Sequence, residues 1–300
     1  MALQENKQIY LFGYPISHSH SPFLQNTSYR LLSLPWTYTL FESQSIPDFL
    51  KLLHGPSCIG AAVTMPHKVS IILHLDGLLD EGRVTGAVNA VIVQWANKHR
   101  TYIGTNTDCI GIREALLSKR LPEDGPSSTV GMVIGGGGTT RAAVYALNKY
   151  LGCSPIYLVN RDDGEVRDVI DHFSETLNID LIHLSAVAEA DGIATPRYIV
   201  GAIPDLPRST AAEVTVREIV KSVFGKKEKG IFLDMCYKPR WTSLLQIAKE
   251  NGWQTVDGIE AMIGQGIAQI SIWSGFDKET IPQEAISKLV RQEVHRKSQT

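Results

Sequence analysis

Short apolar runs alternate with amphipathic stretches along the first 120 residues of the chain. The runs at 8–15, 37–43, 58–65 and 87–95 are predicted β-strands, and the apolar spacing over 22–32 predicts an amphipathic helix. Alternating strands and helices are typical of α/β proteins whose sheets are mainly parallel. We therefore predict an α/β fold for this part of the chain.

A stretch rich in proline and serine, residues 121–129, interrupts this pattern and is the best candidate for a linker between domains. The alternation then resumes with predicted strands at 130–134, 156–159, 198–201 and 230–235, and with predicted helices at 139–150, at 243–251 and from Ile259 onward. The pattern predicts two α/β domains, the second of which starts near residue 125.

The composition excludes several classes of protein. With 300 residues, 43% of them hydrophobic, the chain can bury a sizeable core. The net charge is -2 and no run of basic residues is longer than a pair such as Lys226–Lys227, so the basic stripe of a nucleic-acid-binding protein is missing. The N-terminus lacks the pattern of a signal peptide, and no apolar run approaches the roughly 20 residues of a membrane span. We expect a cytoplasmic protein without nucleic-acid or membrane partners.

The cysteines and histidines do not indicate a metal site. The four cysteines lie far apart and form no CxxC motif, so we expect buried thiols rather than disulfides or zinc ligands: Cys58, Cys109, Cys153 and Cys236. Three histidines in the first half have no carboxylate or cysteine at ligand spacing: His18, His20 and His67. We expect no metal.

Four consecutive glycines lie between the predicted strand at 130–134 and the helix at 139–150: Gly135, Gly136, Gly137 and Gly138. Glycines at such a turn let the backbone approach a pyrophosphate, which then sits at the positive helix N-terminus. The next strand ends about twenty residues later, as in a dinucleotide-binding unit, although Thr140 replaces the third glycine of that fingerprint. The segment predicts cofactor binding, and a tight connection without ligand is the alternative.

The end of the next predicted strand carries the charges that select a cofactor. Asp162, Asp163 and Glu165 are acidic there, and Arg161 is the cation among them. A 2′-phosphate requires cations, whereas a ribose diol requires a carboxylate acceptor. If this turn contacts a cofactor rather than only solvent, the sequence favours NAD over NADP.

Small polar clusters follow the predicted strands of the first half, at 17–22, 63–68, 86–89 and 104–111. Each alone is consistent with a turn or a helix cap. Together they supply serine hydroxyls for a carboxylate, Asn and Asp for ring hydroxyls, and a lysine that can handle the proton of an alcohol during hydride transfer. The clusters therefore predict a hydroxylated acid as substrate.

Eight motifs follow one another along the chain: SxSP (Ser19, Ser21, Pro22), VTxPxK (Val63, Thr64, Pro66, Lys68), GAVN ending at Asn89, GxNTDxxG (Gly104, Asn106, Thr107, Asp108, Gly111), GxGGxxR (Gly135, Gly137, Gly138, Arg141), the strand end Asn160-Arg161, DMxYxP (Asp234, Met235, Tyr237, Pro239) and GxxxMxxQ (Gly258, Met262, Gln265). With these motifs, in this order and over nearly its whole length, the chain resembles the shikimate/quinate dehydrogenases.

The resemblance implies two domains and a set of site residues. Residues 1–120 would form an α/β substrate domain, 121–260 a Rossmann-type doubly wound dinucleotide-binding domain, and 261–300 helices that return to the substrate domain. Lys68 and Asp108 would be the catalytic pair. The substrate would contact Ser19, Ser21, Thr64, Lys68, Asn89, Asp108, Tyr237 and Gln265. The cofactor would contact Gly135, Gly136, Gly137, Gly138, Thr139, Thr140, Arg141, Asn160, Arg161, Asp162, Asp163 and Gly258.

Departures from the family pattern favour one branch. Ala62 and Ala90 replace an asparagine and a threonine, and Asp162 and Glu165 replace the threonine and the arginine of NADP-dependent members. This combination resembles the fungal NAD-dependent quinate dehydrogenases, which implies hydride transfer between NAD and the C3 position of quinate or shikimate by a monomer or homodimer. The alternatives are an NADP-dependent shikimate dehydrogenase of aromatic biosynthesis and a catalytically silent protein that senses quinate or shikimate.

Overall fold

The computed structural model describes residues 6–96, 99–123, 125–127, 129–177, 179–205 and 210–298. Asp124 and Ser128 of the expected linker lie outside these ranges. The chain divides into two compact units, Met1–Thr107 with Met262–Thr300, and Asp108–Ala261. Helix α4 (Asp108–Leu117) packs against elements of the second unit, so this unit begins ahead of the expected linker.

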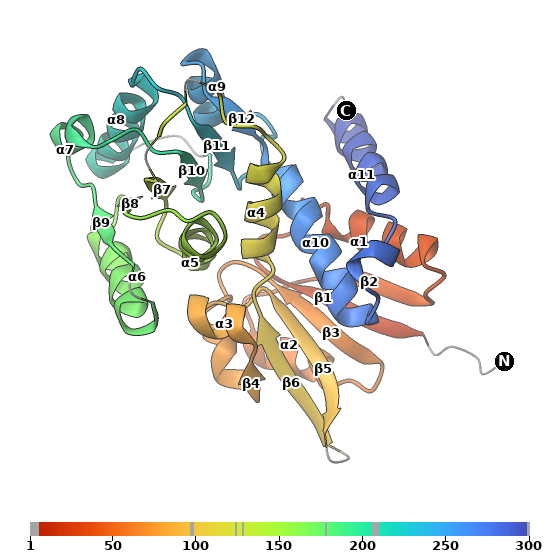
Figure 1. Cartoon of the computed structure of the whole chain (residues 1–300). Coiled ribbons are helices and arrows are strands. Elements are labelled where there is room, and N and C mark those ends of the chain that lie inside the picture. Colours follow the sequence, from red (N-terminus) through yellow and green to blue (C-terminus); the bar gives the residue numbers. More distant parts are fainter. Residues whose placement is uncertain are drawn as a thin grey trace. The chain divides into compact units, whose positions relative to one another are not determined.

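The first unit contains a six-stranded sheet in the order β2-β1-β3-β5-β6-β4 (Figure 1). Its strands are β1 (Lys7–Gly13), β2 (Trp36–Glu42), β3 (Cys58–Val63), β4 (Gly77–Leu78), β5 (Ala90–Ala96) and β6 (His99–Thr105). Strands β1, β2 and β3 are parallel, whereas β5 is antiparallel to both β3 and β6. The sheet is therefore mixed, and β6 has no counterpart among the strands expected from sequence because its residues are mostly polar.

The helices of this unit are α1 (Ser21–Leu31), α2 (Ile46–Leu53), α3 (Asp80–Thr85), the greater part of α10 (Gly258–Ser274), and α11 (Gln283–Lys297), with short 3-10 helices at Ser70–His74 and Lys278–Thr280. Between α2 and the sheet, the ring of Phe12 stacks on Phe49 and on His67, with centroids 4.3 and 4.2 Å apart. His67 is thus a buried core residue, since it is only 5% exposed.

The second unit contains six parallel strands in the order β12-β11-β10-β7-β8-β9. They are β7 (Gly131–Ile134), β8 (Ile156–Val159), β9 (Leu181–His183), β10 (Tyr198–Gly201), β11 (Ile231–Asp234) and β12 (Gln254–Val256). Counted from the start of the unit, this is the order 6-5-4-1-2-3 of a doubly wound dinucleotide-binding sheet. All residues of β7, β10 and β11 are buried, as expected of parallel strands covered on both faces.

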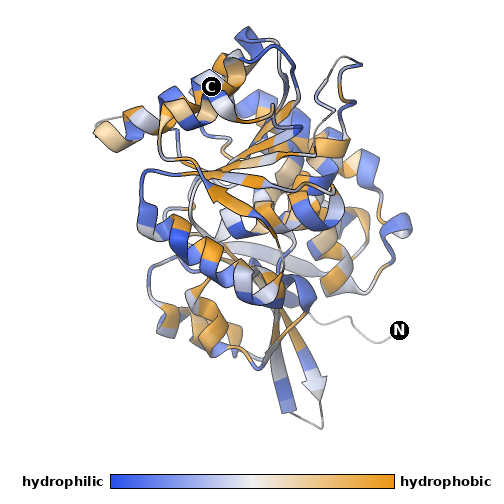
Figure 2. Ribbon diagram, turned by 60° about the vertical axis from the view of Figure 1, so that its left-hand side comes forward, coloured by the Kyte–Doolittle hydropathy of each residue, from blue (hydrophilic) through white to orange (hydrophobic). Residues whose placement is uncertain are grey.

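Helices on both faces of this sheet complete the unit: α4, α5 (Gly138–Tyr145), α6 (Asp163–Thr176), α7 (Val187–Gly192), α8 (Ala211–Gly225) and α9 (Ser243–Glu250). The hydrophobic strands lie against the apolar sides of these helices, whose outer sides are hydrophilic (Figure 2). The helix expected at 139–150 ends as an α-helix at Tyr145 and continues as a π-helical turn over Ala146–Tyr150.

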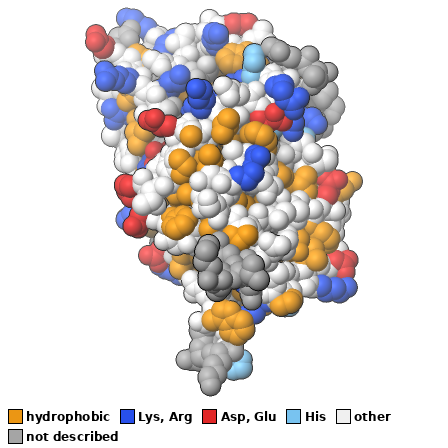
Figure 3. Space-filling model, turned by 90° about the vertical axis from the view of Figure 1, so that its right-hand side faces the viewer, with side chains coloured by type: hydrophobic (Ala, Val, Ile, Leu, Met, Phe, Trp, Pro, Cys, Tyr) orange, Lys and Arg blue, Asp and Glu red, His pale blue; other side chains and the backbone are white. Residues whose placement is uncertain are grey.

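The surface agrees with the balanced composition. On the face shown in Figure 3, most Lys and Arg side chains lie in the upper part with a few Asp and Glu side chains among them, other acidic side chains lie along the sides, and hydrophobic side chains lie between them. Among the described residues, no helix is long and apolar enough to cross a membrane. In the same ranges, no three His, Cys, Asp or Glu side chains are grouped as metal ligands.

Candidate active site

The polar clusters of the first half meet at one edge of the first sheet. Strands β1, β3 and β6 run in the same direction, so their carboxyl ends share an edge, and the antiparallel β5 begins there. Backbone hydrogen bonds join the segments at this edge. The Thr64 N–H donates to the Phe12 carbonyl (2.8 Å), and the Asn89 N–H donates to the Thr105 carbonyl (3.1 Å).

Three predicted or motif side chains form a buried hydrogen-bond network at this edge. The side-chain oxygen of Asn89, Oδ1, accepts a hydrogen bond from the Thr107 backbone N–H at 2.7 Å. The Asn89 amide donates to Thr107 Oγ1 at 3.0 Å and to Gln265 Oε1 at 3.4 Å. Asn89 and Thr107 are 3% and 0% exposed, which fixes the amide orientations. The structure therefore brings Asn89 and Gln265 together, 176 residues apart in sequence.

Sequence inspection missed two glutamines that support this network. Gln269, one turn after Gln265 on α10, donates to the Asn89 backbone carbonyl at 3.4 Å. The Gln25 amide of α1 donates to Gln269 Oε1 at 3.2 Å, and both side chains are buried. The sequence feature that could have identified Gln269 is its spacing of four residues from Gln265 in a helix with few charges, which places both side chains on one face of the helix.

The SxSP loop lies between β1 and α1. The Ser19 N–H donates to the Ile16 carbonyl (2.9 Å), and the Ser21 N–H donates to Ser19 Oγ (3.2 Å). Because Ser19 Oγ accepts this bond, its own hydrogen is left for an acceptor such as a carboxylate. Ser21 is 9% exposed and opens α1.

Lys68 and Asp108 belong to different units. The Lys68 backbone carbonyl accepts from the Val88 N–H at 2.7 Å, which ties the VTxPxK segment to the GAVN segment within the first unit. Asp108 is the first residue of α4 in the second unit, is 6% exposed, and directly follows Thr107 of the buried network. Their pairing in catalysis remains a prediction.

The glycine turn connects β7 to α5, next to β10, where the strand order reverses. In open α/β sheets, ligands bind at this switch point, outside the carboxyl ends of the strands. Gly135 has φ +144°, and a Cβ there would lie 2.8 Å from Thr140 Oγ1. A Cβ on Gly136 would collide with Asn160 and Glu165, whereas Gly137 faces open space.

This geometry fits a dinucleotide pyrophosphate. Gly137 caps α5 with extended backbone, so the first N–H groups of the helix point toward the turn. The Thr140 hydroxyl is buried and has no hydrogen-bond partner in the described part of the chain, the kind of donor that a bound phosphate satisfies. Thr140 stands at the position of the third fingerprint glycine, and its hydroxyl occupies the space that a Cβ on Gly135 would need. The absence of a side chain at Gly135 therefore makes room for a threonine at this position.

The acidic strand end after β8 is held by local hydrogen bonds. Asp162 Oδ1 caps α6 by accepting from the Gly164 and Glu165 N–H groups, at 2.8 and 3.2 Å. The Asn160 amide donates to Glu165 Oε2 at 2.6 Å and places this carboxylate beside the glycine turn.

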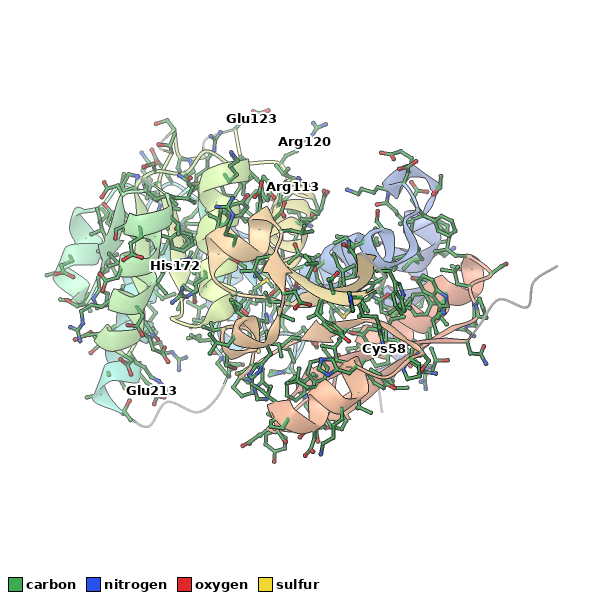
Figure 4. The ribbon with its side chains drawn as sticks, turned by 90° about the horizontal axis from the view of Figure 1, so that it is seen from below. Cys58, Arg113, Arg120, Glu123, His172 and Glu213 are labelled. Atoms are coloured by element: carbon green, nitrogen blue, oxygen red, sulfur yellow. The ribbon has the colours of Figure 1, made fainter. Side chains whose placement is uncertain are left out.

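A second glutamate, which sequence inspection missed, completes this strand end. The guanidinium of Arg161 forms an ion pair with Glu213. Glu213 lies at the start of α8, where Figure 4 labels it. Glu213 is 52 residues away in sequence and part of a capping box with Thr210, so its only local signal was a helix start.

The remaining predicted cofactor and substrate contacts lie at several places in the second unit. Arg141 donates to the Asp168 carbonyl of α6 at 3.3 Å, and burial lowers the pKa of its guanidinium. The Asp163 carboxylate lies 3.9 Å from the His183 ring. Thr139 belongs to the first turn of α5, directly after the glycine turn. Tyr237 follows β11 and is half-buried. A Cβ on Gly258 would lie 2.5 Å from the Met235 carbonyl oxygen, so α10 begins in direct contact with that backbone.

The described cysteines are all free thiols, as the sequence predicted. Cys58, Cys109 and Cys153 are buried, and Cys236 is half-buried. Burial raises the pKa of Cys153 to about 12, which leaves its thiol protonated and unreactive.

A doubly wound sheet with a glycine turn at its switch point, together with a polar edge that carries a lysine, defines the class of protein. It is an oxidoreductase that uses a nicotinamide dinucleotide. Residues 11–91 match the family model described as the shikimate dehydrogenase substrate binding domain.

Relatives that match nearly the whole of this chain agree with this class. The chain is 36% identical to the quinate dehydrogenase of Emericella nidulans in an alignment 315 residues long, which covers 97% of this chain and 95% of that protein. It is also similar to the dehydroquinate dehydratase and shikimate dehydrogenase of Schizosaccharomyces pombe AROM, with TM-score 0.74 and 36% identity over 95% of this chain and 53% of that one. The shikimate dehydrogenase of Thermus thermophilus in complex with NADP(H) and shikimate gives TM-score 0.74 at 25% identity, over 95% and 99% of the two chains. The chain belongs to the shikimate/quinate dehydrogenase family.

Proposed function

We propose that this chain is an NAD-dependent quinate dehydrogenase, which converts quinate and NAD to 3-dehydroquinate and NADH. The observation that carries the cofactor preference is the strand end after β8. Glu165 is held beside the glycine turn, and the cation of this strand end, Arg161, is engaged by Glu213. A 2′-phosphate would therefore meet carboxylates rather than a free guanidinium. The ribose diol of NAD would instead meet hydrogen-bond acceptors.

Lys68 and Asp108 would handle the proton. Oxidation breaks the C3–H bond and the O–H bond of the ring alcohol, and the nicotinamide, when bound, accepts the hydride. Lys68 takes the hydroxyl proton, and the Asp108 carboxylate orients the amine and stabilises its charged form. A general base contributes a factor of about 10²–10⁴ to the rate.

The other predicted side chains would hold the substrate. The hydroxyls of Ser19 and Ser21, with Tyr237, bind the carboxylate, and Thr64, Asn89 and Gln265 bind ring hydroxyls. Supporting this, the Asn89 and Gln265 amides have their orientations set by Thr107 before any ligand arrives. Preorganised amides lose little freedom when a ligand binds.

We propose quinate rather than shikimate as the preferred substrate because of the relative with the matching activity. The Emericella nidulans relative, a quinate dehydrogenase, matches nearly the whole of both chains. Ala62 and Ala90, the two departures from the family pattern, are direct cross-strand partners in β3 and β5, and both are buried. Two alanines thus occupy the positions at which the family pattern has an asparagine and a threonine. Ala62 lies two residues before Thr64 and Ala90 directly follows Asn89, so the surroundings of two proposed substrate contacts are less polar.

The test is a kinetic comparison of quinate and shikimate, each with NAD and with NADP. We expect the highest kcat/KM for quinate with NAD. A highest value for shikimate with NADP would assign the chain to aromatic biosynthesis instead. Binding of either acid without formation of reduced cofactor would instead indicate a catalytically silent protein that senses quinate or shikimate. The expected monomer or homodimer is tested by light scattering on the same preparation, and the expected cytoplasmic location by fractionation.

A further inference from the structure

The loop that carries Ser19 and Ser21 is held by a side chain from another strand. Glu42 is the last residue of β2, and it lies opposite Gly13, the last residue of β1, in the parallel pairing of the two strands. Glu42 Oε2 accepts hydrogen bonds from the backbone N–H groups of Ile16 and Ser17, at 2.5 and 2.6 Å. One carboxylate oxygen thus binds two consecutive N–H groups of this loop.

These two bonds fix the backbone at the start of the loop, where the side chain of Ile16 is also buried. The Tyr14 N–H donates to the Met65 carbonyl, and Pro15 has no N–H, so Ile16 and Ser17 provide the next donors along the chain. Ile16 then accepts the Ser19 N–H through its carbonyl. Glu42 therefore contacts Ile16 directly, and Ile16 in turn contacts Ser19.

The loop ends in the hydrogen bond from the Ser21 N–H to Ser19 Oγ, which orients the Ser19 hydroxyl. Without Glu42, the N–H groups of Ile16 and Ser17 would turn to water, and the Ile16 carbonyl would no longer be held for Ser19. Charge-assisted bonds from a carboxylate to backbone N–H groups are among the stronger hydrogen bonds of a protein. The backbone at Ile16 and Ser17 would lose both of these constraints, while the buried side chain of Ile16 would still anchor the segment.

We propose that Glu42 is a positioning residue for binding of the substrate carboxylate: it holds the SxSP loop so that Ser19 and Ser21 present their hydroxyls together. This rests on the proposed role of the two serines. Glu42 is an exposed residue, so its replacement opens no cavity in the core. Its effect on the substrate is thereby separable from an effect on folding.

The test compares three variants in steady-state kinetics with quinate and NAD. Glu42→Ala should raise KM for the acid about tenfold, with kcat and KM for NAD changed less than about twofold, because the cofactor site lies in the other unit. Glu42→Gln keeps an acceptor oxygen and should restore most of the binding. Asp76→Ala is the matched control, since it removes a carboxylate that accepts one backbone N–H, that of Tyr102 at 2.8 Å, in the same unit.

Coupling to the serine separates positioning from general destabilisation. If Glu42 acts through the two serines, Glu42→Ala/Ser19→Ala/Ser21→Ala should have the KM of Ser19→Ala/Ser21→Ala, within about twofold. Additive effects, or equal effects of Glu42→Ala and Asp76→Ala on KM, would overturn the inference while leaving the serines in place. If Ser19→Ala and Ser21→Ala leave KM unchanged, the proposed carboxylate site and this inference both fail.

Discussion

Replacing Glu213 with Gln should shift the cofactor preference toward NADP. The side chain of Arg161 is 62% exposed and that of Glu213 is 15% exposed, so the ion pair lies at the surface with its carboxylate partly shielded. Glu213→Gln leaves the guanidinium without its ionic partner and removes one negative charge. A 2′-phosphate carries close to two negative charges, and Arg161 is then available to bind it.

The size of the effect follows from the exposure of the pair. A hydrogen bond to a charged group is worth about 1.5–3 kcal/mol when shielded, and an exposed ion pair about 0.2–1 kcal/mol. With Arg161 mostly in solvent, we take about 1 kcal/mol, which is roughly a fivefold rise in kcat/KM for NADP. For NAD, which has no 2′-phosphate, we expect a change below about twofold.

The assay is initial-rate kinetics with both cofactors at low and at high salt. The gain with NADP should shrink at high salt, because exposed charges are screened. It should also disappear in Glu213→Gln/Arg161→Ala. Thr210→Ala is the control, since it breaks the same capping box at the start of α8 without touching Arg161. An unchanged kcat/KM for NADP in Glu213→Gln, or a gain that survives without Arg161, would refute the reasoning.

Three further predictions concern the chemistry, the substrate edge and stability. Lys68→Met should lower kcat about 10²–10⁴-fold with a much smaller change in KM, and a variant that keeps most of its kcat would remove Lys68 from proton transfer. Ala62→Asn buries an amide opposite Ala90 and should cost about 1–3 kcal/mol in urea unfolding; adding Ala90→Thr should recover at least about 0.5 kcal/mol, and strict additivity would contradict the pairing. Since burial raises the pKa of Cys153 to about 12, the unfolded thiol ionises first, so stability is retained below about pH 8.5 and is lost as pH rises further. Between pH 9 and 10.5 the parent should lose up to about 1.4 kcal/mol more per pH unit than Cys153→Ala, and parallel pH profiles would contradict this cause.

Local patterns were sufficient for eight strands, but β4, β6, β9 and β12, and helices such as α2, α6 and α8, were not expected from them. A run such as 130–134 followed by four glycines and a helix predicts a dinucleotide-binding turn, because each part depends only on its neighbours in the chain. The same holds for the strand at 58–65 and the polar residues that follow it. The alternation of strands and helices was likewise enough for the α/β class.

The tertiary structure decided which polar groups meet. Glu42 is 25 residues from Ser17, Glu213 is 52 residues from Arg161, and Gln269 is 180 residues from Asn89. Each looked like an ordinary strand end, helix start or helix residue in the sequence. Asp162, predicted as a cofactor contact, also caps α6, which its position alone did not reveal. A hydrogen bond requires two atoms within about 3 Å, and for residues this far apart that distance is set by strand order and register, which no local window contains.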